Sequence, residues 1–259
     1  MTLPRTIAVL AVIAVTAAGC AELDVGSDVL WTAQFETGSF SEWSDVGGGA
    51  VEVFPMPPNI AEVSNERPHR GGSAAKLTVT APSGESRQTA QLTRAGGLPA
   101  DGYYSAWYYL PVSVNVGTYW VIFKFRTRDD PSDPSTAGER FDLDLTNLAT
   151  GEMTLRLYDH RGGGNVPLAA ADPIVPVGSW FHIEAHYRDT PEGDGRVTYW
   201  LNGRLLVDVE TPALRTAEWV EWDVSSIGEN LSPATAVLYV DDCAVSRTRV
   251  GPTGTIARD

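Results

Sequence analysis

The stretch WFHIEAHYRDTPEGDGRVTYWLNGRLLVD, residues 180–208, decides the fold class. Its first nine residues alternate between apolar and polar side chains, which is the pattern of a half-buried β-strand. The run TPEGDG at 190–195 is typical of a turn. A second strand is predicted at 196–201, and Asn202-Gly203 predicts a tight hairpin into 204–208, because Asn-Gly tolerates the positive φ that a two-residue hairpin needs. The stretch therefore predicts consecutive antiparallel strands.

The rest of the chain repeats this pattern of short strands separated by turns rich in Gly and Pro. The further strands that we expect are 29–35, 74–80, 87–93, 102–110, 119–128, 140–148, 153–160, 220–226 and 237–246. No amphipathic helix, internal repeat or second domain is indicated. The pattern predicts an all-β sandwich or jelly roll of two antiparallel sheets over residues 29–247, followed by an unpacked tail at 248–259.

Length and charge limit the possible partners. The chain has 259 residues, enough for one large domain with a sizeable core. Its formal net charge of −14 argues against nucleic acid, because there is no net positive field to displace phosphate counterions. The charge also weighs mildly against strongly acidic polymers, although a local basic patch can override a global balance. We expect a monomer without an organic cofactor.

The first twenty residues are expected to be a targeting signal. An apolar run at 7–18 is too short to span a bilayer and ends in Ala17-Ala18-Gly19-Cys20. This resembles a bacterial lipobox, which implies a signal peptide at 1–19, a lipid on Cys20, a tether at 20–28 and a location outside the cytoplasm in the bacterial cell envelope. The membrane would be contacted through the lipid anchor only. The alternative is an ordinary secretory signal peptide and a secreted protein.

The chain has two cysteines, Cys20 and Cys243. Lipidation of Cys20 would account for a single remaining thiol in an exported protein. Cys243 lies in an apolar strand, which favours a small buried residue over a reactive one. A disulfide between the two is the rival hypothesis.

The central stretch resembles a known superfamily. Trp180, a His two residues later, a Gly-rich turn, an aromatic strand and Asn202-Gly203 resemble the central hairpins of laminin-G-like and concanavalin A-like jelly rolls. That superfamily mostly handles carbohydrate, so the resemblance implies a polysaccharide partner.

The two ends of the predicted domain carry a second resemblance. FETGSFSEW at 35–43 and LYVDDCAVS at 238–246 resemble the opening and closing strands of carbohydrate-binding jelly rolls. The resemblance implies a structural Ca²⁺ between these ends, with Glu36 and Asp242 as ligands, since calcium takes carboxylate and carbonyl oxygens. Alternatively, these acids are solvated edge residues.

Polar side chains alternate with core positions on several predicted strands. If these strands are neighbours in one sheet, their polar residues form one continuous face. Its members are Lys124, Arg126, Asp142, Asp144, Arg156, Tyr158, His182, Glu184 and His186. Trp107 and Tyr109 could stack against sugar rings there. The alternative is a solvated outer face, with the aromatic residues packed in the core.

Residues 75–245 also resemble polysaccharide lyases. The strand GYYSAWYYLP, the following FKF strand and the W-x-H hairpin are similar to heparin-lyase-like and alginate-lyase-like jelly rolls. Such enzymes remove a proton beside a uronate carboxylate, which needs a cation, a base and an acid. The resemblance implies His186 or Tyr158 as base or acid, with Arg156 and Lys124 holding the carboxylate. Arg87 and His182 are also of suitable type.

Two lyase motifs are absent. The family's Arg-x-Glu pair is replaced by Arg87-Gln88-Thr89, and its Gln-x-His pair by Ile122-Phe123-Lys124. A non-catalytic carbohydrate-binding or surface structural protein on the same scaffold is therefore the alternative.

Other chemistries fit less well. Asp142-Leu143-Asp144 lacks the downstream Glu of a laminarinase-type glycosidase, and no G-x-S-x-G motif is present. His182 and His186 would lie about 13 Å apart on a strand, too far for one zinc ion. His69 and His160 precede Gly-rich turns, where they either edge a binding loop or are solvated.

Overall fold

The structure is a computed structural model that describes residues 28–43, 49–130, 132–169, 172–188, 195–211 and 219–254. These residues form fifteen β-strands and one short 3-10 helix, η1 (Pro134–Thr136). The predicted signal peptide, Cys20 and the last five residues lie outside this set. Within the described ranges, no helix has the length and apolar character needed to cross a membrane.

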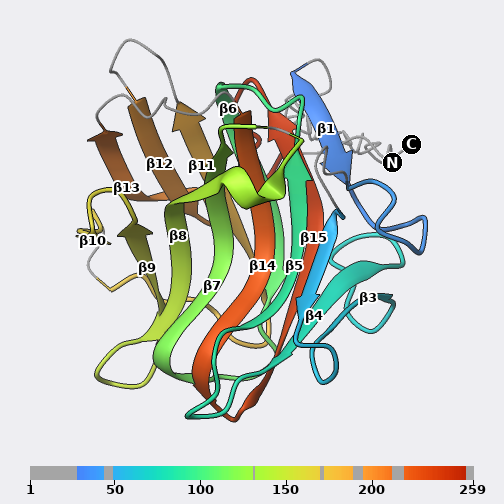
Figure 1. Cartoon of the computed structure of the whole chain (residues 1–259), viewed down its shortest axis with the longest axis vertical. Helices are drawn as coiled ribbons and strands as arrows, with labels where there is room; N and C mark the ends of the chain where they lie inside the picture. Colours follow the sequence, from blue (N-terminus) through green and yellow to red (C-terminus); the bar gives the residue numbers. More distant parts are fainter. Residues whose placement is uncertain are drawn as a thin grey trace, which may run out of the picture.

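The strands form two antiparallel sheets packed face to face. The seven-stranded sheet lies in front in Figure 1. Its strand order is β10-β9-β8-β7-β14-β5-β2. Its strands are β2 (Val51–Phe54), β5 (Gln88–Ala95), β7 (Asn115–Arg128), β8 (Ala137–Asn147), β9 (Met153–Asp159), β10 (Gly164–Val166) and β14 (Trp219–Ser232).

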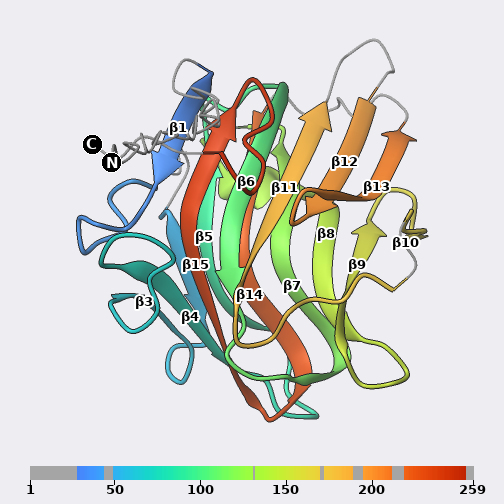
Figure 2. The same ribbon diagram turned by 180° about the vertical axis from the view of Figure 1, so that it is seen from behind.

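The eight-stranded sheet faces the viewer in Figure 2. Its order is β13-β12-β11-β6-β15-β4-β3, and β1 pairs with the C-terminal part of β15, residues 243–246. Its strands are β1 (Val29–Ala33), β3 (Ile60–Ser64), β4 (Ala74–Thr80), β6 (Asp101–Tyr109), β11 (Trp180–Arg188), β12 (Gly195–Leu201), β13 (Arg204–Thr211) and β15 (Thr235–Ser246). The chain is thus an all-β jelly-roll sandwich of two antiparallel sheets, as predicted.

The predicted central hairpins are confirmed. Strands β11 and β12 pair in the register Ile183↔Leu201, and β12 continues into β13 through Asn202-Gly203. The φ angles of Asn202 and Gly203 are 49° and 78°, which is the left-handed conformation that this turn requires. On its other edge, β11 pairs with β6.

Aromatic side chains from both sheets fill the space between them. Trp222 on β14 is fully buried, with ring-centroid distances of 5.6 Å to Tyr104 on β6 and 5.5 Å to Phe123 on β7. Phe125 on β7 stacks on Tyr187 of β11 at 4.4 Å. Burial of this apolar surface holds the two sheets together. Side chains on the opposite face of each sheet are left to form surfaces and sites.

Candidate functional site

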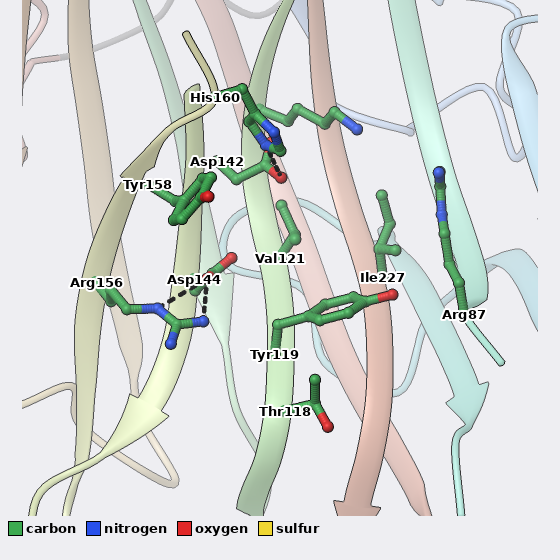
Figure 3. A pocket seen from close by; sticks show the side chains of 11 residues that line it. Arg87, Thr118, Tyr119, Val121, Asp142, Asp144, Arg156, Tyr158, His160 and Ile227 are labelled. Atoms are coloured by element: carbon green, nitrogen blue, oxygen red, sulfur yellow. Dashed lines mark hydrogen bonds and ion pairs between the residues drawn. The ribbon is translucent and has the colours of Figure 1, made fainter. Parts of the chain in front are cut away.

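A pocket of about 460 Å³ lies on the outward face of the seven-stranded sheet (Figure 3). On β8, Phe141, Leu143 and Leu145 belong to the core, so the intervening Asp142 and Asp144 point away from it. Eleven residues line the pocket: Arg87, Thr118, Tyr119, Val121, Lys124, Asp142, Asp144, Arg156, Tyr158, His160 and Ile227. Nine of them lie on β7, β8, β9 and β14, Arg87 directly precedes β5, and His160 directly follows β9.

A β-bulge in β7 shapes the floor of this pocket. The register with β8 shifts between Val121 and Phe123, and the register with β14 shifts at the same level. Ile122 and Phe123 both enter the core as a result, while Tyr119, Val121 and Lys124 all line the pocket. In Figure 3 Tyr119 lies across the pocket toward Ile227. Bulges commonly re-aim side chains next to functional sites.

Asp144 and Arg156 form an ion pair across β8 and β9. Arg156 donates to Oδ2 of Asp144 from Nε at 3.0 Å and from Nη2 at 2.5 Å. Asp144 is only 3% exposed, and its burial raises its pKa to about 6 despite the adjacent guanidinium. Among the described residues, nothing donates a hydrogen bond to its other oxygen, Oδ1, which is also buried.

Asp142 makes the corresponding contact with a histidine. Nε2 of His160 lies 2.8 Å from Oδ2 of Asp142, and the His160 backbone N–H donates to the Arg140 carbonyl at 3.0 Å. Tyr158 lies opposite Asp142 in the strand register, with its ring edge-on to His160 at 4.9 Å. Oδ1 of Asp142 is buried and accepts no hydrogen bond from the described part of the chain.

Positive charge lies on both sides of these acids. The register places Lys124 between Asp142 on β8 and Asp223 on β14. Arg87 lies at the opposite side of the pocket from Arg156 (Figure 3). Its Nε donates to Oγ1 of Thr89 at 3.2 Å, and its side chain is exposed with no carboxylate of the described residues paired to it. Arg87 is therefore well placed to receive an anionic group.

Tyr119 lies between Arg156 and Arg87 (Figure 3). Burial, reinforced by the negative charge of Glu229, raises the pKa of Tyr119 to about 12, and nearby Arg87 acts in the opposite direction. At neutral pH the phenol is therefore protonated and can donate a hydrogen bond.

The prediction that all the polar residues form one face is wrong. Lys124, Asp142, Asp144, Arg156 and Tyr158 do come together in the pocket. Apart from Arg126 on β7, the others belong to the eight-stranded sheet, because β6 and β11 pair with each other and not with β7. These are Trp107, Tyr109, His182, Glu184 and His186.

The three predicted site residues of β11 are buried or bound by neighbouring residues instead. His182 is 1% exposed, and burial, with Arg249 and His69 adding to the effect, lowers its pKa to about 3. Glu184 is fully buried and accepts from Nε of Arg249 at 2.9 Å and from the Val250 backbone N–H at 2.7 Å. Glu184 thus fixes the segment that follows β15, so the prediction of an unpacked tail from residue 248 is wrong for residues 249–251.

His186, Trp107 and Tyr109 are also engaged by the chain itself. Nε2 of His186 lies 2.6 Å from Asp101, and its ring stacks on Tyr103 at 4.5 Å. The His69 ring stacks on Trp107 at 3.9 Å, and Arg67 lies over the Tyr109 ring at 5.6 Å. One loop therefore covers both aromatic rings that were expected to meet sugar.

Arg126 lies outside the pocket as well. It is on β7 but pairs with Glu221 on β14, from Nη1 to Oε1 at 2.8 Å. Arg128 binds the other oxygen of the same carboxylate. This arrangement accounts for a buried Glu221.

The proposed calcium ligands are surrounded by donors. Backbone N–H of Gly72 donates to Glu36 at 3.0 Å, and Nδ1 of His69 lies 2.7 Å from Asp242. These nitrogen groups contact the same carboxylates that a calcium ion would need as oxygen ligands. Across the described ranges, no group of three or more His, Cys, Asp or Glu side chains is arranged to hold a metal. The calcium site stays a prediction.

Cys243 is fully buried on β15, and burial raises the pKa of its thiol. Its suggested disulfide partner, Cys20, lies outside the described residues.

His160 and Tyr119 line the pocket but were not part of the predicted polar face. His160 continues the alternation of Arg156 and Tyr158 by one more step, so a signal for it was present. Tyr119 carried no such signal, because strict alternation places it on the opposite face from Lys124.

Comparison with known proteins identifies the fold. No family model matches the chain, and no curated protein matches its sequence. Endo-β-1,4-glucuronan lyase from the fungus Trichoderma reesei has a similar structure, with a TM-score of 0.60 at 14% identity over 85% of this chain and 96% of that one. Cellulose induced protein Cip1 matches with a TM-score of 0.55 at 16% identity, over 85% and 98%. At these identities the similarity shows a shared fold.

Proposed function

We propose that this protein binds a uronate-containing polysaccharide in the pocket of the seven-stranded sheet and cleaves it by β-elimination. The observation that carries the proposal is the gathering of Arg87, Lys124, Tyr158 and His160 around one cavity. Elimination beside a carboxylate needs a cation for the carboxylate, a proton acceptor and a proton donor. The pocket contains all three kinds of group.

Arg87 is the candidate for holding the substrate carboxylate. Its guanidinium is exposed at the pocket edge, whereas Arg156 is already bound to Asp144. A planar guanidinium matches a carboxylate with two parallel hydrogen bonds. Neutralising the carboxylate makes the adjacent C–H more acidic, which is the first requirement of the reaction.

Tyr158 and His160 are the candidates for proton transfer. Their rings lie 4.9 Å apart, and Asp142 orients His160 through Nε2. In the reaction, one residue takes the proton from the carbon next to the carboxylate. The C–H electrons form a C=C bond as the glycosidic C–O bond breaks, and the departing oxygen takes a proton from the other residue. His160 replaces His186 in this role, because His186 lies on the other sheet.

The comparison supports the substrate class without fixing it. A glucuronan lyase shares the fold with a TM-score of 0.60, but one fold hosts many activities. Glucuronan is therefore the first substrate to test, followed by alginate.

A non-catalytic carbohydrate-binding protein is the second candidate. Asp142 and Asp144 both line the pocket, and their negative charge opposes an anionic substrate. Arg156 is also engaged by Asp144 and less available to a ligand. These two features fit binding of a less charged glycan.

Export and lipidation complete the proposal, and they rest on the Ala17-Ala18-Gly19-Cys20 sequence. We expect the mature protein to be anchored by a lipid on Cys20 at the bacterial cell envelope. Incorporation of a labelled fatty acid in a bacterial host, and its loss in Cys20→Ala, tests this point.

The ultraviolet absorbance of an unsaturated uronate tests the reaction. The purified protein is incubated with glucuronan, alginate, pectate, heparin and a neutral β-glucan. A rise on one of the uronate polymers, lost in Tyr158→Phe and kept in His186→Ala, supports the lyase with its site on the seven-stranded sheet. A flat trace, with retarded migration in a gel that contains one glycan, supports the binding protein. Flat traces with no retardation refute both functions.

A further inference from the structure

Two carboxylate oxygens of pocket-lining residues have no hydrogen-bond donor among the residues that the structure describes. Asp144 binds Arg156 through Oδ2 alone, and Asp142 binds His160 through Oδ2 alone. Oδ1 of each residue is buried, with no donor among the described residues. Native proteins rarely leave such acceptors unsatisfied, because burial without a hydrogen bond costs stability.

Both oxygens belong to residues that line one cavity. Asp142 and Asp144 are two residues apart on β8, so they point to the same side with their backbones about 7 Å apart. The more deeply buried of the two, Asp144, is 3% exposed, so this is not a solvated surface acid. Both residues line the cavity of about 460 Å³.

We propose that Oδ1 of Asp142 and Oδ1 of Asp144 each accept a hydrogen bond from a sugar hydroxyl, so that the site takes polysaccharide with unsubstituted hydroxyls and rejects chains esterified there. This inference rests on the proposed function and specifies the substrate class of the same site.

The chemistry of the pocket favours hydroxyl groups. An ionised carboxylate only accepts hydrogen bonds, and hydroxyls are the donors that a polysaccharide supplies. An acetyl ester in place of a hydroxyl has no hydrogen to donate. A sulfate ester adds a negative charge that the two carboxylates repel. A site built to bond a hydroxyl discriminates strongly against an analogue that lacks it, because its own buried group is then left unpaired.

The arrangement also orients the sugar. Arg87 lies across the pocket from β8, on the far side of β7 and β14 (Figure 3). A uronate with its carboxylate toward Arg87 turns its other edge toward Asp142 and Asp144. The hydroxyl-bearing edge of the sugar is thus bound by residues of β8, and the carboxylate edge by Arg87 beside β5.

Affinity electrophoresis at pH 8 tests the inference. Asp144 is ionised at this pH because its pKa is about 6. The wild-type protein is run in gels that contain glucuronan or alginate, and in gels that contain the same polymers after chemical O-acetylation. We expect at least roughly tenfold tighter binding to the unsubstituted polymer, since hydrogen bonds to charged groups are among the stronger ones.

Asp144→Asn and Asp142→Asn are the test variants. Each amide keeps one acceptor for Arg156 or His160 and presents an N–H₂ donor in place of the unpaired oxygen. Binding to the unsubstituted polymer is expected to fall roughly tenfold in each, and the preference over the acetylated polymer to narrow. Asp208→Asn is the matched control, because Asp208 also pairs with an arginine, Arg196, but lies on β13 of the other sheet.

The outcomes separate the inference from the proposed function. Equal wild-type affinity for both polymers overturns the inference and leaves the lyase or binding function standing. Wild-type affinity in both Asp→Asn variants also overturns it, since solvent then satisfies the oxygens. Binding to none of the polymers overturns the proposed function and the inference together. If a variant melts at a lower temperature than the wild type, the wild-type preference alone decides.

Discussion

Replacing Asp144 by Asn is expected to stabilise the protein at pH 8. The carboxylate is 3% exposed, and its pKa is raised from an ordinary 3.8 to about 6. Burial is the largest cause and outweighs the hydrogen bonds from Arg156. The folded protein therefore accommodates the neutral acid better than the ionised one.

The size of the effect follows from the shift in pKa. A shift of about two units corresponds to roughly 3 kcal/mol, to an order of magnitude. Because the pKa is higher in the folded state, the folded state binds more protons between pH 3.8 and 6. The free energy of unfolding is therefore highest below this range and falls as pH rises through it. Asn cannot ionise, so Asp144→Asn should match the wild type near pH 4 and exceed it by up to about 3 kcal/mol at pH 8.

Urea unfolding followed by tryptophan fluorescence at pH 4, 6 and 8 measures this difference. Asp208→Asn is a control of opposite sign. Arg196, together with Thr198, lowers the pKa of Asp208. The ionised Asp208 therefore stabilises the folded protein above pH 3.8, and this stabilisation is lost as pH falls through the lowered pKa of the folded state. That variant should lose stability at pH 8 and approach the wild type in acid.

Two results would refute the reasoning. If Asp144→Asn is less stable than the wild type at pH 8, the ion pair with Arg156 outweighs burial. If the two proteins differ equally at every pH, ionisation of Asp144 is not the cause. A variant that is more stable but binds polysaccharide poorly would instead fit a site where function is maintained at a cost in stability.

Three further predictions concern single residues. Arg87→Ala should weaken binding of uronate polymers roughly tenfold in affinity electrophoresis, with unfolding free energy within about 0.5 kcal/mol of wild type because the side chain is exposed; equal loss for a neutral glucan would argue against a carboxylate contact. Tyr158→Phe should lower the elimination rate by about 100-fold or more, while His186→Ala, on the other sheet, should leave it nearly unchanged; the reverse order would place the site on β11. Glu221→Ala should cost about 3–5 kcal/mol in urea unfolding, because it removes a fully buried carboxylate that binds both Arg126 and Arg128; a loss below 1 kcal/mol would mean that other groups or solvent replace the lost contacts.

The sequence predicts local strand pairs well. Strands β8 and β9 are joined by the short turn ATGE, so alternation along each strand is enough to place Asp144 beside Arg156 and Asp142 beside Tyr158. The hairpin at Asn202-Gly203 is predicted for the same reason, since its register depends on the turn between its strands. Half of the site therefore follows from residues that are close in sequence.

The assignment of strands to sheets does not follow from alternation. A strand with one apolar and one polar face looks the same in either sheet of a sandwich. The chain passes from the eight-stranded sheet at β6 to the seven-stranded sheet at β7, and returns at β11. His182, Glu184 and His186 have the same alternating pattern as Asp142 and Asp144, yet they lie on the opposite side of the molecule.

The bulge in β7 has a further consequence for the pocket. Tyr119 and Lys124 are five residues apart, an odd spacing that puts them on opposite faces of a regular strand. One extra residue at Ile122 restores them to the same face, and Val121 with them. The apolar run WVIF at 120–123 tolerates the bulge, because both Ile122 and Phe123 can enter the core. The same run conceals it, since a continuous apolar stretch has no alternation to interrupt. Tyr119 thus reaches the pocket through backbone geometry that side-chain pattern alone does not encode.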